Sequence, residues 1–162
     1  MIDTHPAEPS PAPGGASEKA GKTTLAQTIA AFESLTPASV SALGRIYAQD
    51  ARFVDPFNQV QGLAQVQAIY RHMFETLEQP RFVVTGKLVE ADQCFLLWDF
   101  HFRFRAFRRE TAQKIAGTSH LHFNPQGLIT LHHDYWDAVH GLYQQMPVIG
   151  ILMRWLRRRA NS

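Results

Sequence analysis

The sequence predicts an α+β fold, with helices in the first half of the chain and an antiparallel sheet in the second. Before Pro80, apolar residues recur every three or four positions, as on helices that pack against a core. After Pro80, apolar and polar residues alternate, as in strands with one buried face. The chain has 162 residues, of which 45% are hydrophobic. That is enough for one folded domain with its own core.

Two helices are expected at the start of the folded part. The first begins near Thr23 and carries an apolar stripe, Leu25, Ile29, Phe32 and Leu35. The second begins at Pro37 with Thr36 as its N-cap, because proline suits the first helical position and threonine accepts a hydrogen bond there. We expect this helix to continue to about Asp50, with Val40, Leu43, Ile46 and Tyr47 on its apolar face.

A short extended piece over residues 52–54 is expected next, and Asp55-Pro56 stops it. Gly62 then precedes a third helix. Its apolar residues are Leu63, Val66, Ile69, Tyr70 and Phe74.

Four strands are expected after Pro80, over residues 81–90, 93–105, 113–123 and 128–136. Short turns join the later ones, so we expect an antiparallel meander. The second strand has the clearest alternation. One of its faces consists of Cys94, Leu96, Trp98, Phe100, Phe102 and Phe104.

The two ends of the chain differ in composition from the domain predicted at 23–140. Residues 1–22 are rich in proline and glycine and are expected to be a disordered tail. Residues 141–162 are expected to form a basic amphipathic helix. We expect it to pack on its own domain or on a dimer partner, with weak contact to an anionic membrane surface as the alternative. The residues for that contact are Arg154, Trp155, Arg157, Arg158 and Arg159.

Composition excludes several classes of protein and site. Sixteen Lys and Arg against 14 Asp and Glu leave a net charge of +2, so no nucleic-acid partner is predicted. A single cysteine, Cys94, rules out an intramolecular disulfide. The spacing of the eight histidines matches no common metal motif, so no metal site is expected. Without a visible secretory signal or membrane span, a cytoplasmic location is expected.

Three segments together resemble a known superfamily. They are Tyr-Ala-Gln-Asp-Ala-Arg-Phe-Val-Asp-Pro-Phe at 47–57 with Gly62, Gly-Thr-Ser-His-Leu-His-Phe-Asn-Pro-Gln-Gly-Leu-Ile at 117–129, and His-Asp-Tyr-Trp-Asp at 133–137. In order and spacing they are similar to the nuclear transport factor 2 superfamily, in its SnoaL-like polyketide cyclase and ketosteroid isomerase branch. The resemblance covers roughly residues 25–140. It implies a cone, in which a strongly bent antiparallel sheet wraps around three helices, and homodimers through the outer sheet face.

Asp55 is the first candidate for chemistry. It follows the extended piece at 52–54, and Pro56 biases it toward extended geometry. The resemblance implies that Asp55 is a general base. A carboxylate at the mouth of an apolar cavity has a raised proton affinity, which suits that role. The alternative is that Asp55 accepts hydrogen bonds from nearby amides and caps the turn before the third helix.

Asp134 and Ser119 are the other catalytic candidates. On the last strand Asp134 shares a face with His132 and Trp136. The resemblance implies that Asp134 and Trp136 line the cavity, where two carboxylates could divide into an acid and a base. The alternative for Asp134 is a place at the sheet rim, paired with an arginine.

Ser119 stands where the isomerases have a protonated acid that stabilises the enolate. The position of their tyrosine falls at Ala31-Phe32, which has no hydroxyl, so steroid isomerase activity is not expected. The residues expected to line a ligand pocket, for which plain core packing is the alternative, are Phe32, Tyr47, Phe57, Trp98, Phe100, His132 and Trp136.

The sequence therefore favours a small enzyme that moves a proton on an apolar carbonyl compound without metal or organic cofactor. Asp55 would be the base, and Asp134 or Ser119 would polarise the substrate. The alternative is a non-catalytic small-molecule-binding or protein-interaction domain of the same fold, since fold alone does not decide function. Two inward carboxylates without cationic partners would favour the enzyme. An Asp55 held by backbone amides would favour the binding module.

Overall fold

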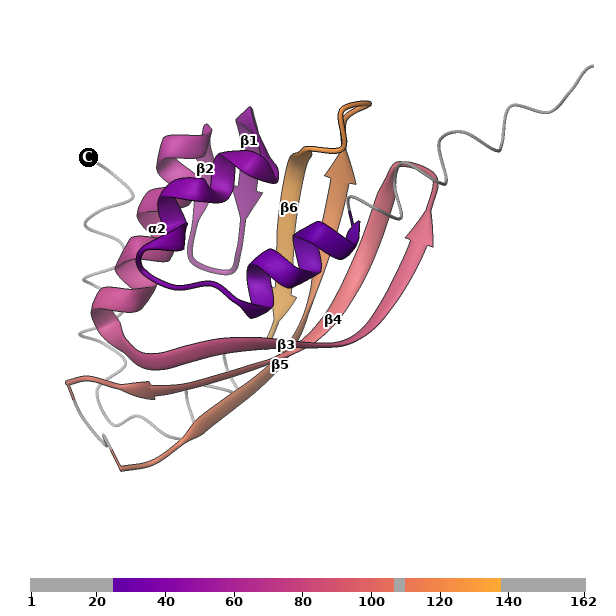
Figure 1. Cartoon of the computed structure of the whole chain (residues 1–162). Coiled ribbons are helices and arrows are strands. Elements are labelled where there is room, and N and C mark those ends of the chain that lie inside the picture. Colours follow the sequence, from indigo (N-terminus) through magenta and orange to yellow (C-terminus); the bar gives the residue numbers. More distant parts are fainter. Residues whose placement is uncertain (1–24, 107–109, 138–162) are drawn as a thin grey trace, which may run out of the picture.

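The computed structural model describes residues 25–106 and 110–137, and there the helices lie on one side of a curled six-stranded sheet (Figure 1). The helical elements are a first helix over residues 25–33, the 3-10 helix η1 (Ser39–Arg45) and α2 (Leu63–Thr76). The strands are β1 (Tyr47–Val54), β2 (Gln59–Gln61), β3 (Leu77–Glu90), β4 (Gln93–Phe104), β5 (Gln113–Phe123) and β6 (Ile129–Trp136). The predicted α+β class is confirmed.

The first helix lies against the sheet through the side predicted from its periodicity. Leu25 and Phe32 are buried, and Ile29 and Leu35 pack against the core from partly buried positions. Thr28 on the same side is fully buried. Side chains spaced three and four apart share one face of a helix, which explains this pattern.

The second helix is shorter than predicted. It is a 3-10 helix that ends at Arg45, and the chain is already extended at Tyr47. The expected cap, Thr36, lies one turn earlier. Its Oγ1 accepts a hydrogen bond from the amide of Ser39 at 3.2 Å, and Ser39 Oγ accepts one from the amide of Thr36 at 2.9 Å. The prediction to Asp50 was wrong because pairing with the sheet overrides the helix-like spacing of the apolar residues here.

The third helix agrees with the sequence, and the loop before it contains an unpredicted strand. In α2, Val66 and Tyr70 are buried in the core. Gly62 precedes α2 with φ of 99°, a conformation that glycine adopts without strain. The short strand β2 pairs with the end of β1, so that residues 55–58 form the tight connection between the two.

The meander β3-β4-β5-β6 is confirmed, since each neighbouring pair is antiparallel. Strand β3 starts at Leu77, before Pro80 rather than after it. Its register with β4 shifts between Glu78 and Arg81, and Gln79 has φ of 51°. Proline cannot donate to a sheet ladder, and a bulge of this kind accommodates it.

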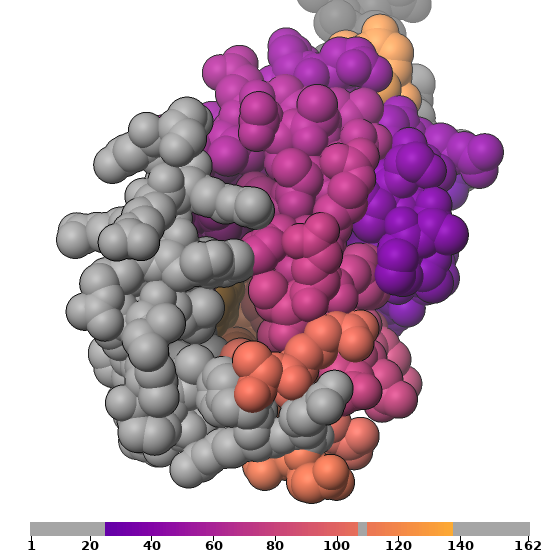
Figure 2. All heavy atoms as spheres, turned by 90° about the vertical axis from the view of Figure 1, so that its left-hand side faces the viewer, coloured from indigo at the N-terminus to yellow at the C-terminus, as the bar shows by residue number. Residues whose placement is uncertain are grey.

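Strand β1 joins the two halves of the chain by pairing in parallel with β6, in the order β2-β1-β6-β5-β4-β3. In Figure 2 the magenta helix α2 faces the viewer, and the indigo first helix lies beside it.

The predictions for residues 1–22 and 141–162, including the basic group at 154–159, lie outside the described residues. Within the described ranges, no helix combines the length and apolar character needed to cross a membrane.

Candidate functional site

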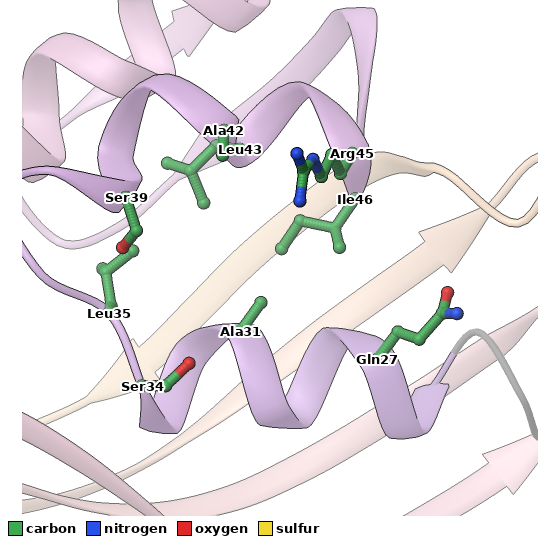
Figure 3. Close-up of a pocket in the computed structure, with 9 residues that line it drawn as sticks. All are labelled: Gln27, Ala31, Ser34, Leu35, Ser39, Ala42, Leu43, Arg45 and Ile46. Carbon is green, nitrogen blue, oxygen red and sulfur yellow. The ribbon is translucent and has the colours of Figure 1, made fainter.

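An open groove of about 470 Å³ runs between the first helix and η1 (Figure 3). Its lining residues are Gln27, Ala31, Ser34, Leu35, Ser39, Ala42, Leu43, Arg45 and Ile46. None of the residues predicted for chemistry lines this groove. Ser34 Oγ donates to the carbonyl of Ala30 and Ser39 Oγ to that of Thr36, so both hydroxyls are used within their own turns.

A second, much smaller cavity lies against the concave side of the sheet and brings together most of the predicted chemistry. Its volume is about 20 Å³, enough for roughly one water molecule. Its lining combines one carboxylate, one imidazole and two hydroxyl-bearing side chains with aromatic and aliphatic ones. The lining residues are Phe32, Tyr70, Phe82, Val84, Leu96, Trp98, Ser119, His132 and Asp134.

The sheet register explains why Asp134, Ser119 and His132 meet. Ser119 on β5 is paired with Asp134 on β6, and both side chains point to the concave face. His132 is two residues before Asp134 on the same strand and so lies on the same face. The pairing of β5 with β6 therefore brings these three groups together, and it agrees with the shared face predicted for His132 and Asp134.

Hydrogen bonds link these groups through one oxygen of Asp134. Ser119 Oγ lies 2.5 Å from Asp134 Oδ1, and His132 Nε2 lies 2.8 Å from the same atom. Trp98 Nε1 donates to Ser119 Oγ at 2.9 Å. The Asp134 side chain is 13% exposed, and that of its partner His132 is 3% exposed. No contact among the described residues engages Asp134 Oδ2 in a hydrogen bond.

Two tyrosines extend the network into the core. His132 Nδ1 lies 2.5 Å from the hydroxyl of Tyr47, and that hydroxyl lies 3.2 Å from the hydroxyl of Tyr70. Tyr47 was predicted as a pocket residue, but it has no exposed surface and lies behind His132. Burial raises the pKa of both tyrosines well above the usual value, so they stay neutral.

Asp55 has the bonding of a turn cap. Its Oδ1 accepts hydrogen bonds from the amides of Phe57 at 2.7 Å and Asn58 at 2.6 Å. The Asn58 side-chain amide bonds both carboxylate oxygens, at 3.0 and 2.9 Å. This bonding is the arrangement expected of a binding module, because the carboxylate oxygens are already engaged by the turn.

The charge on Asp55 nevertheless interacts with that on Asp134. Burial raises the pKa of Asp55, and the Asp134 charge raises it further. The hydrogen bonds from Asn58 and Phe57 act in the opposite direction, because they stabilise the ionised form. The two predicted carboxylates are therefore electrostatically coupled, but only Asp134 lines the cavity.

The other predicted pocket residues are divided between the cavity and its surroundings. Phe32 and Trp98 line the cavity. Phe57 and Trp136 pack on each other with ring centres 5.3 Å apart, and Phe100 stacks on Phe82 at 4.4 Å. These three predicted residues are not among the lining residues.

Four cavity residues were not predicted to line the pocket: Tyr70, Phe82, Val84 and Leu96. Leu96 shares a strand face with Trp98, so alternation was an available signal. Tyr70 belongs to an apolar helical stripe, and nothing in the sequence near it marks a polar partner. Among the described residues, no three His, Cys, Asp or Glu side chains are grouped so that they could hold a metal ion.

Comparison with known proteins shows the family. The sequence profile of the SnoaL-like domain matches residues 28–132, more than half of the chain. No curated protein matches the chain.

Solved structures share the fold at low sequence identity. A putative SnoaL-like polyketide cyclase from Jannaschia sp. has a TM-score of 0.66 at 14% identity, covering 82% of this chain and 97% of its own. A protein with a ketosteroid isomerase-like fold from Catenulispora acidiphila, in complex with trimethylamine, has 0.64 at 19%, covering 75% and 90%. An LEH-like epoxide hydrolase from M. tuberculosis has 0.61 at 11%, covering 85% and 94%.

The order of the elements, the sheet topology and the family match over residues 28–132 all indicate the same fold. The chain belongs to the SnoaL-like domain family.

Proposed function

We propose that this protein is a small acid–base enzyme that transfers a proton on an apolar carbonyl compound, with Asp134 as the base. The observation that carries the proposal is the placement of Asp134. One oxygen is held by Ser119 and His132, while the carboxylate lines an otherwise largely apolar cavity. A carboxylate that is oriented by hydrogen bonds and shielded from water is well placed to act as a general base.

This proposal moves the base from Asp55 to Asp134. The Asp55 oxygens already accept bonds from Asn58 and the amide of Phe57, so abstraction of a proton by Asp55 would compete with the turn. Ser119 changes role as well. Its hydroxyl has one proton, which it donates to Asp134, so it polarises a substrate only by releasing that carboxylate.

The size of the cavity sets a requirement on substrate entry. A space of about 20 Å³ admits no carbonyl compound larger than a few atoms, so side chains must move when the substrate binds. Phe82 and Val84 line the cavity from β3, which is an edge strand of the sheet. We place the entry route there.

Two of the similar structures are named as enzymes, a putative polyketide cyclase and an LEH-like epoxide hydrolase. These names support the proposal that the cavity is an active site. The second candidate function is non-catalytic binding of an apolar small molecule. The turn bonding of Asp55 favours it.

Deuterium exchange distinguishes the two functions. The probe is 2-tetralone, whose protons beside the ketone are acidic, followed by NMR in heavy water with the full-length protein. We expect the protein to accelerate exchange and Asp134→Asn to reduce the acceleration by about 100-fold or more. Asp55→Asn is the matched carboxylate variant and should retain most of it.

The binding of 2-tetralone, measured by its effect on thermal unfolding, completes the test. Retained binding with lost exchange in Asp134→Asn supports catalysis by Asp134. Binding by the parent protein without any acceleration of exchange would favour the binding module. Loss of exchange in Asp55→Asn alone would return the role of base to Asp55.

A further inference from the structure

The chain of hydrogen bonds behind Asp134 has a consistent placement for every proton. An indole Nε1–H can only donate, so Ser119 Oγ accepts from Trp98. The Ser119 proton then goes to Asp134 Oδ1, its shorter contact at 2.5 Å, rather than to His132 Nε2 at 3.2 Å. An ionised carboxylate oxygen only accepts, so the contact of 2.8 Å with His132 requires a proton on Nε2.

The other ring nitrogen of His132, Nδ1, also has a hydrogen-bond partner. A neutral imidazole with its proton on Nε2 has a lone pair on Nδ1, which accepts from the Tyr47 hydroxyl. The Tyr47 oxygen in turn accepts from Tyr70. The opposite tautomer would place the lone pair of Nε2 against the carboxylate oxygen, and that contact is repulsive.

Packing fixes the ring of His132 in this orientation. The ring centre of Phe53 lies 4.8 Å away, that of Phe32 lies 5.5 Å away, and Tyr47 lies parallel to the imidazole at 5.9 Å. His132 is 3% exposed, so it is enclosed among these rings. A buried group that is both packed and hydrogen-bonded at each polar atom is held in one geometry.

We infer that His132 is a positioning residue, held by Tyr47 and Tyr70 as the tautomer with its proton on Nε2, which fixes Asp134 Oδ1 and leaves Oδ2 as the basic atom. The tautomer and the contacts stand independently of any reaction. The assignment of Oδ2 as the atom that takes the proton rests on the proposed function. Both tyrosines act on Asp134 through His132: Tyr47 lies behind the imidazole with no exposed surface, and the Tyr70 hydroxyl bonds that of Tyr47. Tyr70 also lines the cavity.

The tautomer is tested without a substrate. Long-range proton–nitrogen NMR correlations of the full-length protein at neutral pH report which imidazole nitrogens are protonated, and His132→Gln identifies the signals of His132 by their loss. We expect a protonated Nε2 and an unprotonated Nδ1. In Tyr47→Phe the Nδ1 signal should shift toward that of a nitrogen that accepts no hydrogen bond.

His133, the next residue on β6, provides a matched control for the NMR experiment. His133 points to the opposite face of β6, where it stacks on Tyr135 at 4.1 Å, and His133→Gln should leave the signals of His132 unchanged. A proton on Nδ1 of His132, or protons on both nitrogens at neutral pH, would overturn the inference. So would an unchanged Nδ1 signal in Tyr47→Phe.

The positioning role is tested in the exchange assay with 2-tetralone. A glutamine amide can replace the Nε2–H donor, whereas phenylalanine fills the space without a donor. We expect His132→Gln to keep most of the activity and His132→Phe to lose about 100-fold, since misplacing a reacting group has an effect of that order. Equal losses in both variants would contradict a role as donor to Asp134.

The two proposals fail in different ways. If the parent protein does not accelerate exchange, the proposed function fails, while the NMR experiment still decides the tautomer. If exchange depends on Asp134 but His132 has its proton on Nδ1, the proposed function stands and the positioning role fails.

Discussion

Gly117 lies directly under the indole ring of Trp98, its cross-strand partner on β4. A methyl group on Gly117 would come within 2.5 Å of Trp98 Cζ2 and 2.7 Å of Cζ3, which is too close for carbon atoms. The absence of a side chain at this one position therefore lets Trp98 reach Ser119 with its Nε1.

Gly117→Ala should displace Trp98 and break its hydrogen bond to Ser119. We expect a loss of about 2 kcal/mol in the free energy of unfolding, the usual size of an overpacking effect. Urea denaturation measures the loss, and tryptophan fluorescence reports the movement of the indole. Gly86→Ala is the matched control, because its new methyl group would meet Leu97 at 3.7 Å, an ordinary contact. Equal effects in both variants would mean that Trp98 is not held by this contact.

Phe82→Ala should enlarge the cavity. The Phe82 ring stands edge-on to Trp98 at 5.5 Å and lines the cavity from the edge strand. We expect a loss of about 2 kcal/mol in stability, since the ring is only half-buried, and tighter binding of a small apolar probe such as indole. Calorimetric titration measures the binding. Phe95→Ala, on the opposite face of β4, removes an equal ring and should not change affinity for indole. If Phe82→Ala binds indole no more tightly than the parent, Phe82 does not control entry to the cavity from β3.

Asp55→Asn should change the dependence of stability on pH. Burial raises the pKa of Asp55, so between the unfolded value near 3.8 and the raised folded value the native state binds more protons than the unfolded state. Stability from this group is present at low pH and is lost as pH rises through that window. Asparagine does not titrate and still accepts the turn amides. Relative to the parent, Asp55→Asn should therefore gain stability between pH 4 and pH 7.

Urea denaturation at the two pH values measures this difference. Asp50→Asn removes a carboxylate at an exposed position on β1 and serves as the control. If the parent instead gains stability over Asp55→Asn as pH rises, the hydrogen bonds of the turn outweigh burial, and the sign of the pKa shift is reversed.

The convex face of the sheet is expected to be the homodimer interface. Four large apolar side chains are exposed there, namely Leu88, Phe95, Leu97 and Tyr135. They lie in two adjacent cross-strand rows, since Leu88 pairs with Phe95 and Leu97 with Thr118, which pairs with Tyr135. An apolar patch of this kind is typical of a contact surface.

Leu97→Glu should weaken self-association, because it places a charge in the middle of that patch. Sedimentation velocity over a range of concentrations measures the change. Gln65→Glu adds the same charge on α2, at an exposed position on the helical side, and should sediment like the parent. A parent protein that is monomeric at all concentrations would exclude the dimer.

The sequence predicted the meander well because each strand has a face that alternation reveals. In β4 the side chains of Cys94, Leu96 and Trp98 are buried as expected. The sequence did not predict the start of β1, because Ile46 and Tyr47, on either side of the boundary between η1 and β1, fit a helical stripe. Only pairing of Tyr47 with Ile129, far along the chain, makes that segment a strand. Local spacing contains no information about a partner at that distance.

The candidate site was predictable to the extent that it lies on alternating strands. Asp134, Ser119 and His132 meet because their strand positions share a face. Asp55 was ambiguous, since an aspartate before proline fits both a base and a turn cap, and the choice depends on the orientation of Asn58. Tyr70 reaches the network from α2 by a contact that helical periodicity does not predict.

The parallel pairing of β1 with β6 also has a kinetic consequence. Tyr47 and His132 are separated by 85 residues, so their contact closes a long loop and forms only after most of the chain has been made. During synthesis Tyr47, which bonds Tyr70, therefore lacks its partner His132 until β6 has been made. Mutations such as Tyr47→Phe should accordingly speed unfolding while leaving the refolding rate nearly unchanged.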